Sequence, residues 1–381
     1  MLKSTLRKTS KSILLLGPRQ VGKSTLLRDL KPNMTIDLSQ ESDFLRFSID
    51  PDLLTSLAEA SQPKIIFIDE IQRIPSILNT AQFLLDQAKV EGKSLKFLFS
   101  GSSAAKLRRS SANFLPGRIL QYNLSGLSAN EVGGKINWKK ALRFGFLPEP
   151  YLAKDSPETE KLLSSYASVY LREEIQNEAL VRSIQGFARF LSVVGSNAGQ
   201  VFDFSKASTK AKVSRTSSIR FVEILEDTLI AERLNVFDRA ETADTIRHPK
   251  IYFFDVGVLN GLLNNFQASA DRLRILTEHI VYNQIRNSAI AFDIPVRISY
   301  FRTRHGLEVD FIVELKQKVW AIEVKSGDVV RADLEPLKSF KKYFPQVHRS
   351  IVVSDSETKK RSIDGIEIGP LEWLLDEMGL M

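Results

Sequence analysis

The chain is organised around one stretch, Gly17-Pro18-Arg19-Gln20-Val21-Gly22-Lys23-Ser24-Thr25. The apolar run at residues 12–16 predicts a buried strand before it, and residues 26–30 follow with helical spacing. A strand, a glycine-bearing turn, Gly-Lys-Ser and a helix make up the Walker A pattern in the context that it requires. In such a loop backbone N–H groups surround phosphate oxygens, the lysine faces the terminal phosphates and the serine hydroxyl binds Mg²⁺. We therefore expect residues 17–25 to bind ATP, with Lys23 on the phosphates and Ser24 on Mg²⁺.

The composition is that of a globular chain with several domains. It has 381 residues, 26% charged and 43% hydrophobic, and this length predicts two to four domains. The absence of cysteine excludes disulfides and thiolate zinc sites and fits a cytoplasmic location. No apolar run reaches the length that spans a bilayer, and residues 1–8 lack the apolar core of a signal peptide, so we expect no membrane partner. The net charge of +8 weakly favours a polyanionic partner.

Two more predicted strands end in polar side chains. Residues 64–68 read as a buried parallel strand that ends in Asp69 and Glu70. Such strands bind ligands at their carboxyl ends, so Asp69 would hold Mg²⁺ through water and Glu70 would polarise the water that attacks the γ-phosphate. Residues 95–99 predict another core strand, followed by Ser100-Gly101-Ser102-Ser103. Ser102 is the first candidate for a contact with the γ-phosphate or that water and Ser100 the second, although a serine-rich helix start explains either serine as well.

Arg118 stands just before another strand-like run at residues 119–124. The order of a Walker A loop, an acidic strand end, a polar strand end and an arginine resembles the AAA+ ATPases. In that superfamily the arginine reaches into the nucleotide site of a neighbouring subunit and stabilises the transition state, as arginine fingers do. The resemblance thus implies that Arg118 is catalytic and that the protein is a homo-oligomer, a hexameric ring. The alternative is a surface arginine on an ordinary strand.

Residues 126–178 predict a small helical lid, with helices near residues 138–144 and 161–175. Four sequence features narrow the resemblance: Asp-Glu-Ile-Gln at 69–72, Ser-Gly-Ser-Ser at 100–103, Gly-x-x-Pro-Glu at 145–149 and Tyr-Leu-Arg-Glu-Glu-Ile at 170–175. Together they resemble one prokaryotic ATPase family, whose members carry a C-terminal module of the restriction-endonuclease-like, or PD-(D/E)XK, kind. The resemblance covers nearly the whole chain. One departure is the turn at residues 145–148, where the family pattern has a second glycine.

The middle of the chain predicts a winged helix-turn-helix. Three helices, near residues 186–194, 204–207 and 214–227, precede a strand-like run, and the third would be the recognition helix. Asp203 is the only acid between Ala179 and Arg220. Basic and hydroxyl side chains suit phosphate contacts. We expect six of them to contact DNA: Lys210, Lys212, Arg215, Thr216, Ser217 and Arg220. The alternative is a winged helix that only packs against the ATPase.

The C-terminal region predicts a mixed α/β module. A helix over residues 273–285 and strands over 297–302, 307–314 and 319–325 would bring Glu278, Asp310, Glu323 and Lys325 together, with residues 316–318 as a tight turn. An acid followed by Glu-x-Lys on the next strand resembles the PD-(D/E)XK nucleases. The resemblance implies that the three carboxylates bind Mg²⁺ and that Lys325 orients water or stabilises charge at the phosphate. Where that family has Glu-Asn this chain has Glu278-His279, and a nuclease-like fold that binds DNA or serves in assembly without cutting is the alternative.

These expectations combine into one α/β protein with four parts: a P-loop AAA+ core over residues 1–125, a helical lid over 126–178, a winged helix over 179–247 and an endonuclease-like domain over 248–381. We expect a cytoplasmic ATPase that uses ATP and Mg²⁺ to move along or remodel duplex or branched DNA, with metal-dependent DNA cleavage in its last domain. Two alternatives stay open. One is a nucleotide switch that controls assembly with a protein partner, and the other is a nuclease regulated by ATP.

Overall fold

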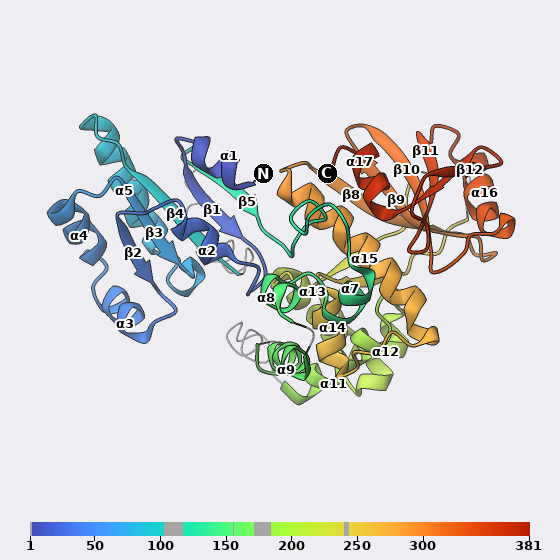
Figure 1. The fold of residues 1–381 in the computed structure, drawn as a ribbon. Helices are drawn as coiled ribbons and strands as arrows, with labels where there is room; N and C mark the ends of the chain where they lie inside the picture. Colours follow the sequence, from blue (N-terminus) through green and yellow to red (C-terminus); the bar gives the residue numbers. More distant parts are fainter. Residues whose placement is uncertain (1, 103–116, 155, 171–183, 240–243) are drawn as a thin grey trace. The chain divides into compact units, whose positions relative to one another are not determined.

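The computed structural model describes residues 2–102, 117–154, 156–170, 184–239 and 244–381 (Figure 1). The chain divides into two compact units, Met1–Ser125 with Asp227–Leu229, and Gly126–Glu226 with Ile230–Met381. Among the described residues, no helix has both the length and the apolar character that crossing a membrane requires.

The first unit is built on a five-stranded sheet in the order β2-β3-β4-β1-β5, in which all pairs are parallel. Strand β4 therefore lies between the strand that leads into residues 17–25 and the strand that ends at Asp69. Pairing of Leu16 with Gly101 and of Asp37 with Asp69 brings the carboxyl ends to one edge of the sheet. The strands are β1 (Ser12–Leu16), β2 (Met34–Asp37), β3 (Ile65–Asp69), β4 (Lys96–Gly101) and β5 (Ile119–Asn123).

Helices cover both faces of this sheet because neighbouring strand residues point to opposite sides. Leu14 and Leu16 share a core with α3, α4 and α5, whereas Ile13 and Leu15 pack with α1 and α2. The helices are α1 (Leu2–Lys8), α2 (Lys23–Arg28), α3 (Glu41–Ile49), α4 (Leu53–Ser61) and α5 (Ile77–Val90), with a 3-10 turn η1 (Ile71–Arg73) after β3.

The second unit begins with the helices α7 (Trp138–Phe144), α8 (Pro148–Leu152) and α9 (Pro157–Ser165), and α9 runs into a π-helical turn η2 (Tyr166–Tyr170). The turn between α7 and α8 contains a single glycine. Gly145 has φ of 66°, and a Cβ there would lie 2.2 Å from Oδ1 of Asp255. The buried Asp255 carboxylate accepts the backbone N–H of Phe146 at 2.5 Å and of Val258 at 3.0 Å. One glycine at this turn is therefore sufficient, because Phe146 and Leu147 are buried in the core.

Three helices and a two-stranded antiparallel sheet follow, in the element order that a winged helix-turn-helix requires; the winged helix itself stays a prediction. They are α11 (Ile184–Ser196), α12 (Phe204–Ala211), α13 (Arg215–Asp227), β6 (Ala231–Leu234) and β7 (Lys250–Phe253). The loop between β6 and β7 is held along strand β8 (Val296–Arg302): Phe237 N–H donates to Tyr300 O at 2.7 Å, and Ile246 N–H to Arg302 O at 3.1 Å. The predicted boundary at residue 247 falls inside this loop.

The C-terminal part is a mixed six-stranded sheet in the order β12-β13-β11-β10-β9-β8. Strands β8 to β10 are antiparallel, and β10, β11 and β13 are parallel. A two-residue turn joins β9 to β10, with φ of 48° at Lys316 and 64° at Gln317. Its other elements are α14 (Val256–Leu263), α15 (Ala270–Ala291), β9 (Glu308–Leu315), β10 (Lys318–Lys325), η3 (Arg331–Leu334), α16 (Glu335–Tyr343), β11 (Arg349–Ser354), β12 (Arg361–Ile363), β13 (Ile366–Gly369) and α17 (Leu371–Glu377).

Candidate functional site

The loop at residues 17–25 is fixed at its start by backbone packing. Gly17 N–H donates to Gly101 O at 3.2 Å, and a Cβ at Gly17 would lie 2.1 Å from the carbonyl oxygen of Leu124. Only glycine therefore fits between the end of β4 and the chain that follows β5. Gly22 has φ of 93°, in the left-handed region that favours glycine, and the chain enters α2 directly after it.

Lys23 is buried beside this loop. Its Nζ donates to the carbonyl oxygens of Gly17 at 2.9 Å and of Pro18 at 2.8 Å. The ammonium group is thus already held against the loop, where it can meet phosphate oxygens without a large change of rotamer.

Ser24 and Asp69 meet at the carboxyl end of the sheet. Ser24 Oγ donates to Asp69 Oδ1 at 2.9 Å, and Ser100 Oγ donates to the same carboxylate oxygen. Ser100 also accepts the backbone N–H of Glu70 at 3.2 Å, so this serine ties β3 to β4. A hydroxyl and a carboxylate are hard oxygen donors of the kind that Mg²⁺ prefers, and the residues present fit that ion.

Glu70 is connected to Ser102 through Gln72, a residue that received no role from the sequence. Gln72 is buried, and its Nε2 donates to Glu70 Oε2 and, at 2.9 Å, to Ser102 Oγ. The backbone of Glu70 is left-handed, with φ of 58°, a conformation that non-glycine residues hold only where the surroundings enforce it. The sequence signal for Gln72 is its place at the end of the Asp-Glu-Ile-Gln stretch at 69–72, one of the features of the family resemblance.

Arg118 lies at the start of the edge strand β5 and is paired within its own chain. Its Nε and a terminal guanidinium nitrogen approach Asp86 Oδ1 of α5 at 2.8 Å and 2.6 Å. The side chains of Arg118 and Asp86 are 38% and 43% exposed, so solvent reaches the pair. Exposed Phe83 and Leu120 are carried on the same two elements.

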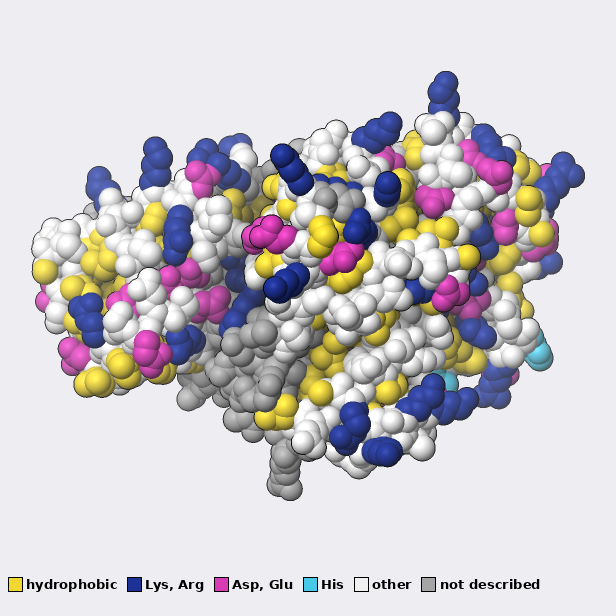
Figure 2. Space-filling view, turned by 60° about the horizontal axis from the view of Figure 1, so that its bottom comes forward, with side chains coloured by type: hydrophobic (Ala, Val, Ile, Leu, Met, Phe, Trp, Pro, Cys, Tyr) yellow, Lys and Arg dark blue, Asp and Glu magenta, His cyan; other side chains and the backbone are white. Residues whose placement is uncertain are grey.

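The six residues expected at DNA differ in exposure. Lys210, Lys212, Arg215 and Thr216 are exposed. Ser217 is half-buried and shares a 2.8 Å hydrogen bond with Ser214, and Arg220 pairs with Glu223 at 3.0 Å. On the face that α11 and α12 help to form, Lys and Arg side chains gather at the lower right of Figure 2, with few acidic side chains among them. The exposed four are therefore the members of this set that can reach a ligand without breaking a contact.

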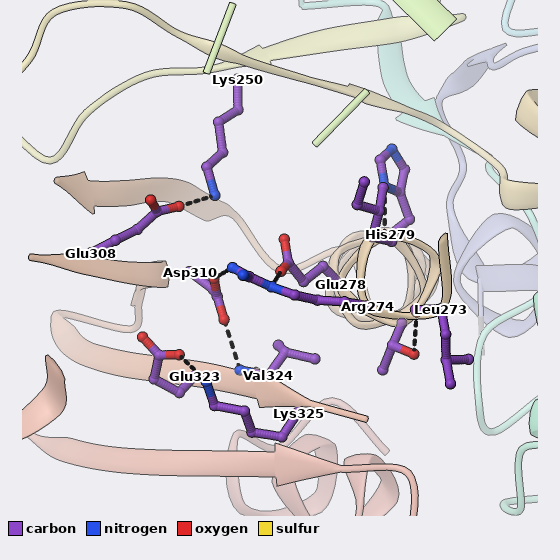
Figure 3. A network of polar contacts seen from close by, with 12 residues as sticks. Lys250, Leu273, Arg274, Glu278, His279, Glu308, Asp310, Glu323, Val324 and Lys325 are labelled. Atoms are coloured by element: carbon purple, nitrogen blue, oxygen red, sulfur yellow. Dashed lines mark hydrogen bonds and ion pairs between the residues drawn. The ribbon is translucent and has the colours of Figure 1, made fainter. Parts of the chain in front are cut away.

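The C-terminal side chains Glu278, Asp310, Glu323 and Lys325 do come together, but an arginine joins them (Figure 3). Arg274, one helical turn before Glu278 in α15, donates from Nε to Glu278 Oε1 at 2.8 Å and reaches Asp310 Oδ1 at 3.8 Å. Asp310 also accepts the backbone N–H of Val324 at 2.9 Å, and Lys325 Nζ lies 3.6 Å from Glu323 Oε2. The guanidinium thus supplies positive charge to the carboxylates that the sequence assigned to a metal.

Burial and like charge both act on the carboxylates of this cluster. Burial and the neighbouring charge of Asp310 raise the pKa of both Glu278 and Glu323, and the pKa of Glu323 lies well above its usual range. Over the ranges that the structure describes, no three His, Asp or Glu side chains are arranged to hold a metal ion. The binding of Mg²⁺ by these carboxylates stays a prediction, and here Arg274 is the cation that Glu278 and Asp310 meet.

His279, next to Glu278, takes no part in the cluster. It is fully buried, its Nδ1 lies 3.1 Å from Ile275 O, and its ring stacks near Tyr252. Burial lowers the pKa of His279 to about 4, so the ring is neutral at physiological pH. The residue that departs from Glu-Asn is therefore part of the core, and among the described residues its ring has no hydrogen bond to the carboxylates.

Comparison with family models divides the chain into three matched segments. Residues 9–133 match a model described as an AAA domain. Residues 135–269 match a domain of unknown function (DUF8612), and residues 275–374 match another domain of unknown function (DUF4143). The first unit, with its parallel sheet and P-loop, is therefore an AAA-type, ATPase-like domain, and the chain ends in a DUF4143 domain with a mixed sheet.

Individual proteins resemble the chain more distantly. The uncharacterized proteins Rv2008c of Mycobacterium tuberculosis and Mb2031c of Mycobacterium bovis are each 28% identical over 320 residues, which is 82% of this chain and 70% of theirs. The replication initiator DnaA bound to AMPPCP and single-stranded DNA aligns with 59% of this chain and 84% of its own, at 12% identity and a TM-score of 0.27. The Aeropyrum pernix ORC1 protein in complex with DNA aligns with 71% of this chain and 91% of its own, at 13% identity and a TM-score of 0.27. TM-scores this low do not establish a common fold over the matched lengths.

Proposed function

We propose that the protein binds ATP in the loop at residues 17–25 and hydrolyses it to ADP and phosphate. The observation that carries the proposal is the meeting of Lys23, Ser24, Asp69 and Glu70 at one edge of a parallel sheet. Loop N–H groups and Lys23 would hold the phosphates, and Ser24 and Asp69 would hold Mg²⁺, which neutralises phosphate charge when bound. Glu70 would accept the proton of the attacking water, and Gln72 and Ser102 would position its carboxylate.

Nucleotide binding tests the first step directly. A fluorescent ATP analogue, titrated with Mg²⁺ present, should bind the full chain and lose most of its affinity in Lys23→Ala. Lys89→Ala is the matched control, because Lys89 is exposed on α5 and has no ion pair with any described residue. Equal affinity of all three proteins would contradict the assignment of the loop.

The second element of the proposal is an oligomer in which Arg118 acts on the nucleotide of a neighbouring copy. Three features support it: Arg118 is half exposed, it stands on an edge strand, and exposed Phe83 (59%) and Leu120 (42%) occur on α5 and β5. The form that the AAA+ resemblance implies is a hexameric ring. Sedimentation of the Glu70→Gln variant with ATP tests the assembly, because slow turnover would keep ATP bound. A monomer at all protein concentrations would contradict the oligomer.

The third element is the use of hydrolysis to move along or remodel duplex or branched DNA. Its support is the row of exposed cations and hydroxyls from Lys210 to Thr216 at the start of α13, together with an overall net charge of +8. Loss of duplex binding in Lys212→Ala with Arg215→Ala, but not in Lys341→Ala on α16, would support it. Undiminished binding by the double variant would contradict it.

For the C-terminal domain, the position of Arg274 favours a module that does not cut DNA. Arg274 bonds Glu278 and lies near Asp310, where a metal-dependent nuclease would need its ion. Plasmid, linear and four-way DNA incubated with Mg²⁺ or Mn²⁺ should give the same products with the wild type and with Asp310→Ala. Metal-dependent cleavage that disappears in Asp310→Ala and Lys325→Ala would establish a nuclease instead.

A further inference from the structure

A basic cleft lies between α12 and the turn that joins β8 to β9. It has a volume of about 470 Å³. Four Lys or Arg side chains and one Asp line it, together with His248. The charged members of its lining are Lys206, Lys210, Arg302, Arg304 and Asp203. The cleft shares no residue with the nucleotide loop or the carboxylate cluster, and it shares Lys210 with the residues proposed to contact DNA.

The acidic side chains in and beside the cleft already have hydrogen-bond or ion-pair partners. Asp203 caps α12, where its Oδ1 accepts the backbone N–H groups of Ser205 at 2.8 Å and Lys206 at 3.1 Å. Across the cleft, Arg302 pairs with Glu308 at 2.8 Å and Arg304 with Asp244 at 3.2 Å.

The lysine side chains of α12, in contrast, have no ion-pair partner among the described residues. Lys206 and Lys210 are exposed, lie four residues apart on one face of the helix, and form no ion pair with any residue that the structure describes. Like charges at this spacing repel each other and weaken a helix slightly. A bound anion would relieve this repulsion.

The walls of the cleft are held by backbone hydrogen bonds, so the cations do not depend on a flexible loop. Phe202 N–H donates to Pro249 O at 2.7 Å, which fixes the start of α12 against the chain before β7. On the other side Arg304 N–H donates to Asp244 O at 2.9 Å, and Thr245 and Thr303 form an antiparallel bridge. A preformed site loses less conformational entropy when a ligand binds.

The lining of the cleft suits phosphate. Its four Lys and Arg side chains supply positive charge, and the ring of Phe202 is 2% exposed and offers no face on which a base could stack. His248 is exposed and can donate to a phosphate oxygen. The remaining polar side chains, Asn197 and Thr303, can donate to phosphate oxygens. We infer that this cleft holds the sugar-phosphate backbone of duplex DNA without reading its sequence. The inference rests on the proposed DNA binding and extends the contact surface from the start of α13, through Lys210, to Lys206.

The salt dependence of binding tests this site, because each neutralised phosphate contributes about 0.9 to the slope of log K against log salt. Fluorescence anisotropy with two duplexes of unrelated sequence would measure that slope for the full chain. Lys206→Ala should lower the slope by about 1 for both duplexes, and adding Lys210→Ala, a residue that the proposed DNA contact already includes, should lower it by about 1 more. Lys206→Arg with Lys210→Arg, which keeps both charges, should retain the slope, and Lys341→Ala is the surface control.

The outcomes separate this inference from the proposal beneath it. If the wild type binds neither duplex at low salt, the proposed DNA binding fails and the cleft fails with it. If the wild type binds and the Lys212→Ala with Arg215→Ala variant is weakened, while the alanine variant of the cleft keeps the wild-type slope, the cleft alone is refuted. The thermal unfolding midpoint of each variant should equal that of the wild type. A smaller salt slope then reports a lost contact with DNA and not misfolding.

Discussion

The ion pair between Arg118 and Asp86 allows a test that separates catalysis from structure. Both side chains are about 40% exposed, at 38% and 43%, and pairs of this kind contribute about 0.2–1 kcal/mol. An arginine that acts on a neighbour's nucleotide contributes roughly 10³–10⁵ in rate, which corresponds to about 4–7 kcal/mol of transition-state stabilisation. The two roles therefore differ several-fold in free energy, and they appear in different measurements.

We expect Arg118→Ala to keep nucleotide affinity and lose turnover by about 10³ or more. Asp86→Asn removes the partner within the chain but keeps Arg118, so its turnover should stay within about fivefold of wild type, the factor that 1 kcal/mol represents. Phosphate release under excess ATP measures both variants.

Mixing adds a sharper test. Arg118→Ala chains keep their own loop, and Lys23→Ala chains keep Arg118, so mixed oligomers should regain part of the activity that each variant lacks alone. If Arg118→Ala turns over ATP like the wild type, or if both variants of the pair lose activity equally and mixing restores none, the assignment of Arg118 to a neighbour's site is wrong.

Three further predictions concern single side chains. Glu70→Gln should bind ATP with near wild-type affinity and lose about 10²–10⁴ in turnover, because an amide cannot accept the proton of the attacking water; equal turnover would exclude Glu70 as the base. Burial raises the pKa of Asp255 from 3.8 to about 6, so the stability that its protonated form contributes is complete below about pH 4 and is lost as the pH rises towards 6. Relative to Asp255→Asn, the wild type should lose about 3 kcal/mol of unfolding free energy over that interval. Denaturant midpoints of the two proteins that change in parallel with pH would contradict this. Gly145→Ala places a Cβ 2.2 Å from Asp255 Oδ1 at φ of 66° and should lower the thermal midpoint, whereas an unchanged midpoint would show that the turn can move.

The nucleotide site could be predicted from the sequence because its signals are local. Continuous apolar runs identify β1, β3 and β4, and each ends where a polar or glycine-bearing segment begins, so Lys23, Ser24, Asp69 and Glu70 follow from strand ends alone. In the C-terminal sheet the sequence predicts the strands β8, β9 and β10, whereas it does not predict β12 and β13. The roles of these residues remain predictions.

The contacts that Ser102, Arg118 and Asp310 make with other side chains could not be predicted, because the residues in contact are distant in sequence. Gln72 meets Ser102 only because β3 and β4 are neighbours, and Asp86 meets Arg118 across 32 positions of sequence. Arg274 stands four residues before Glu278, which is visible in the sequence, but its approach to Asp310 depends on how α15 packs against the C-terminal sheet.

The pairing of the chain before β7 with β8 could not be predicted from the sequence either. Nothing in the sequence indicates that residues 235–237 and Ile246 bond to β8, because such pairing is decided by which strand edge is left uncovered in the folded chain. The basic cleft exists only through this pairing, since it brings the turn after β8 to α12.

The most direct test of the central claim is phosphate release by the full chain, with Mg²⁺, over a titration of duplex DNA at a stated low salt concentration. We predict turnover that rises with DNA, that Lys23→Ala abolishes and that Lys89→Ala retains. Turnover by the wild type that never exceeds the Lys23→Ala level, even at saturating DNA, would contradict it.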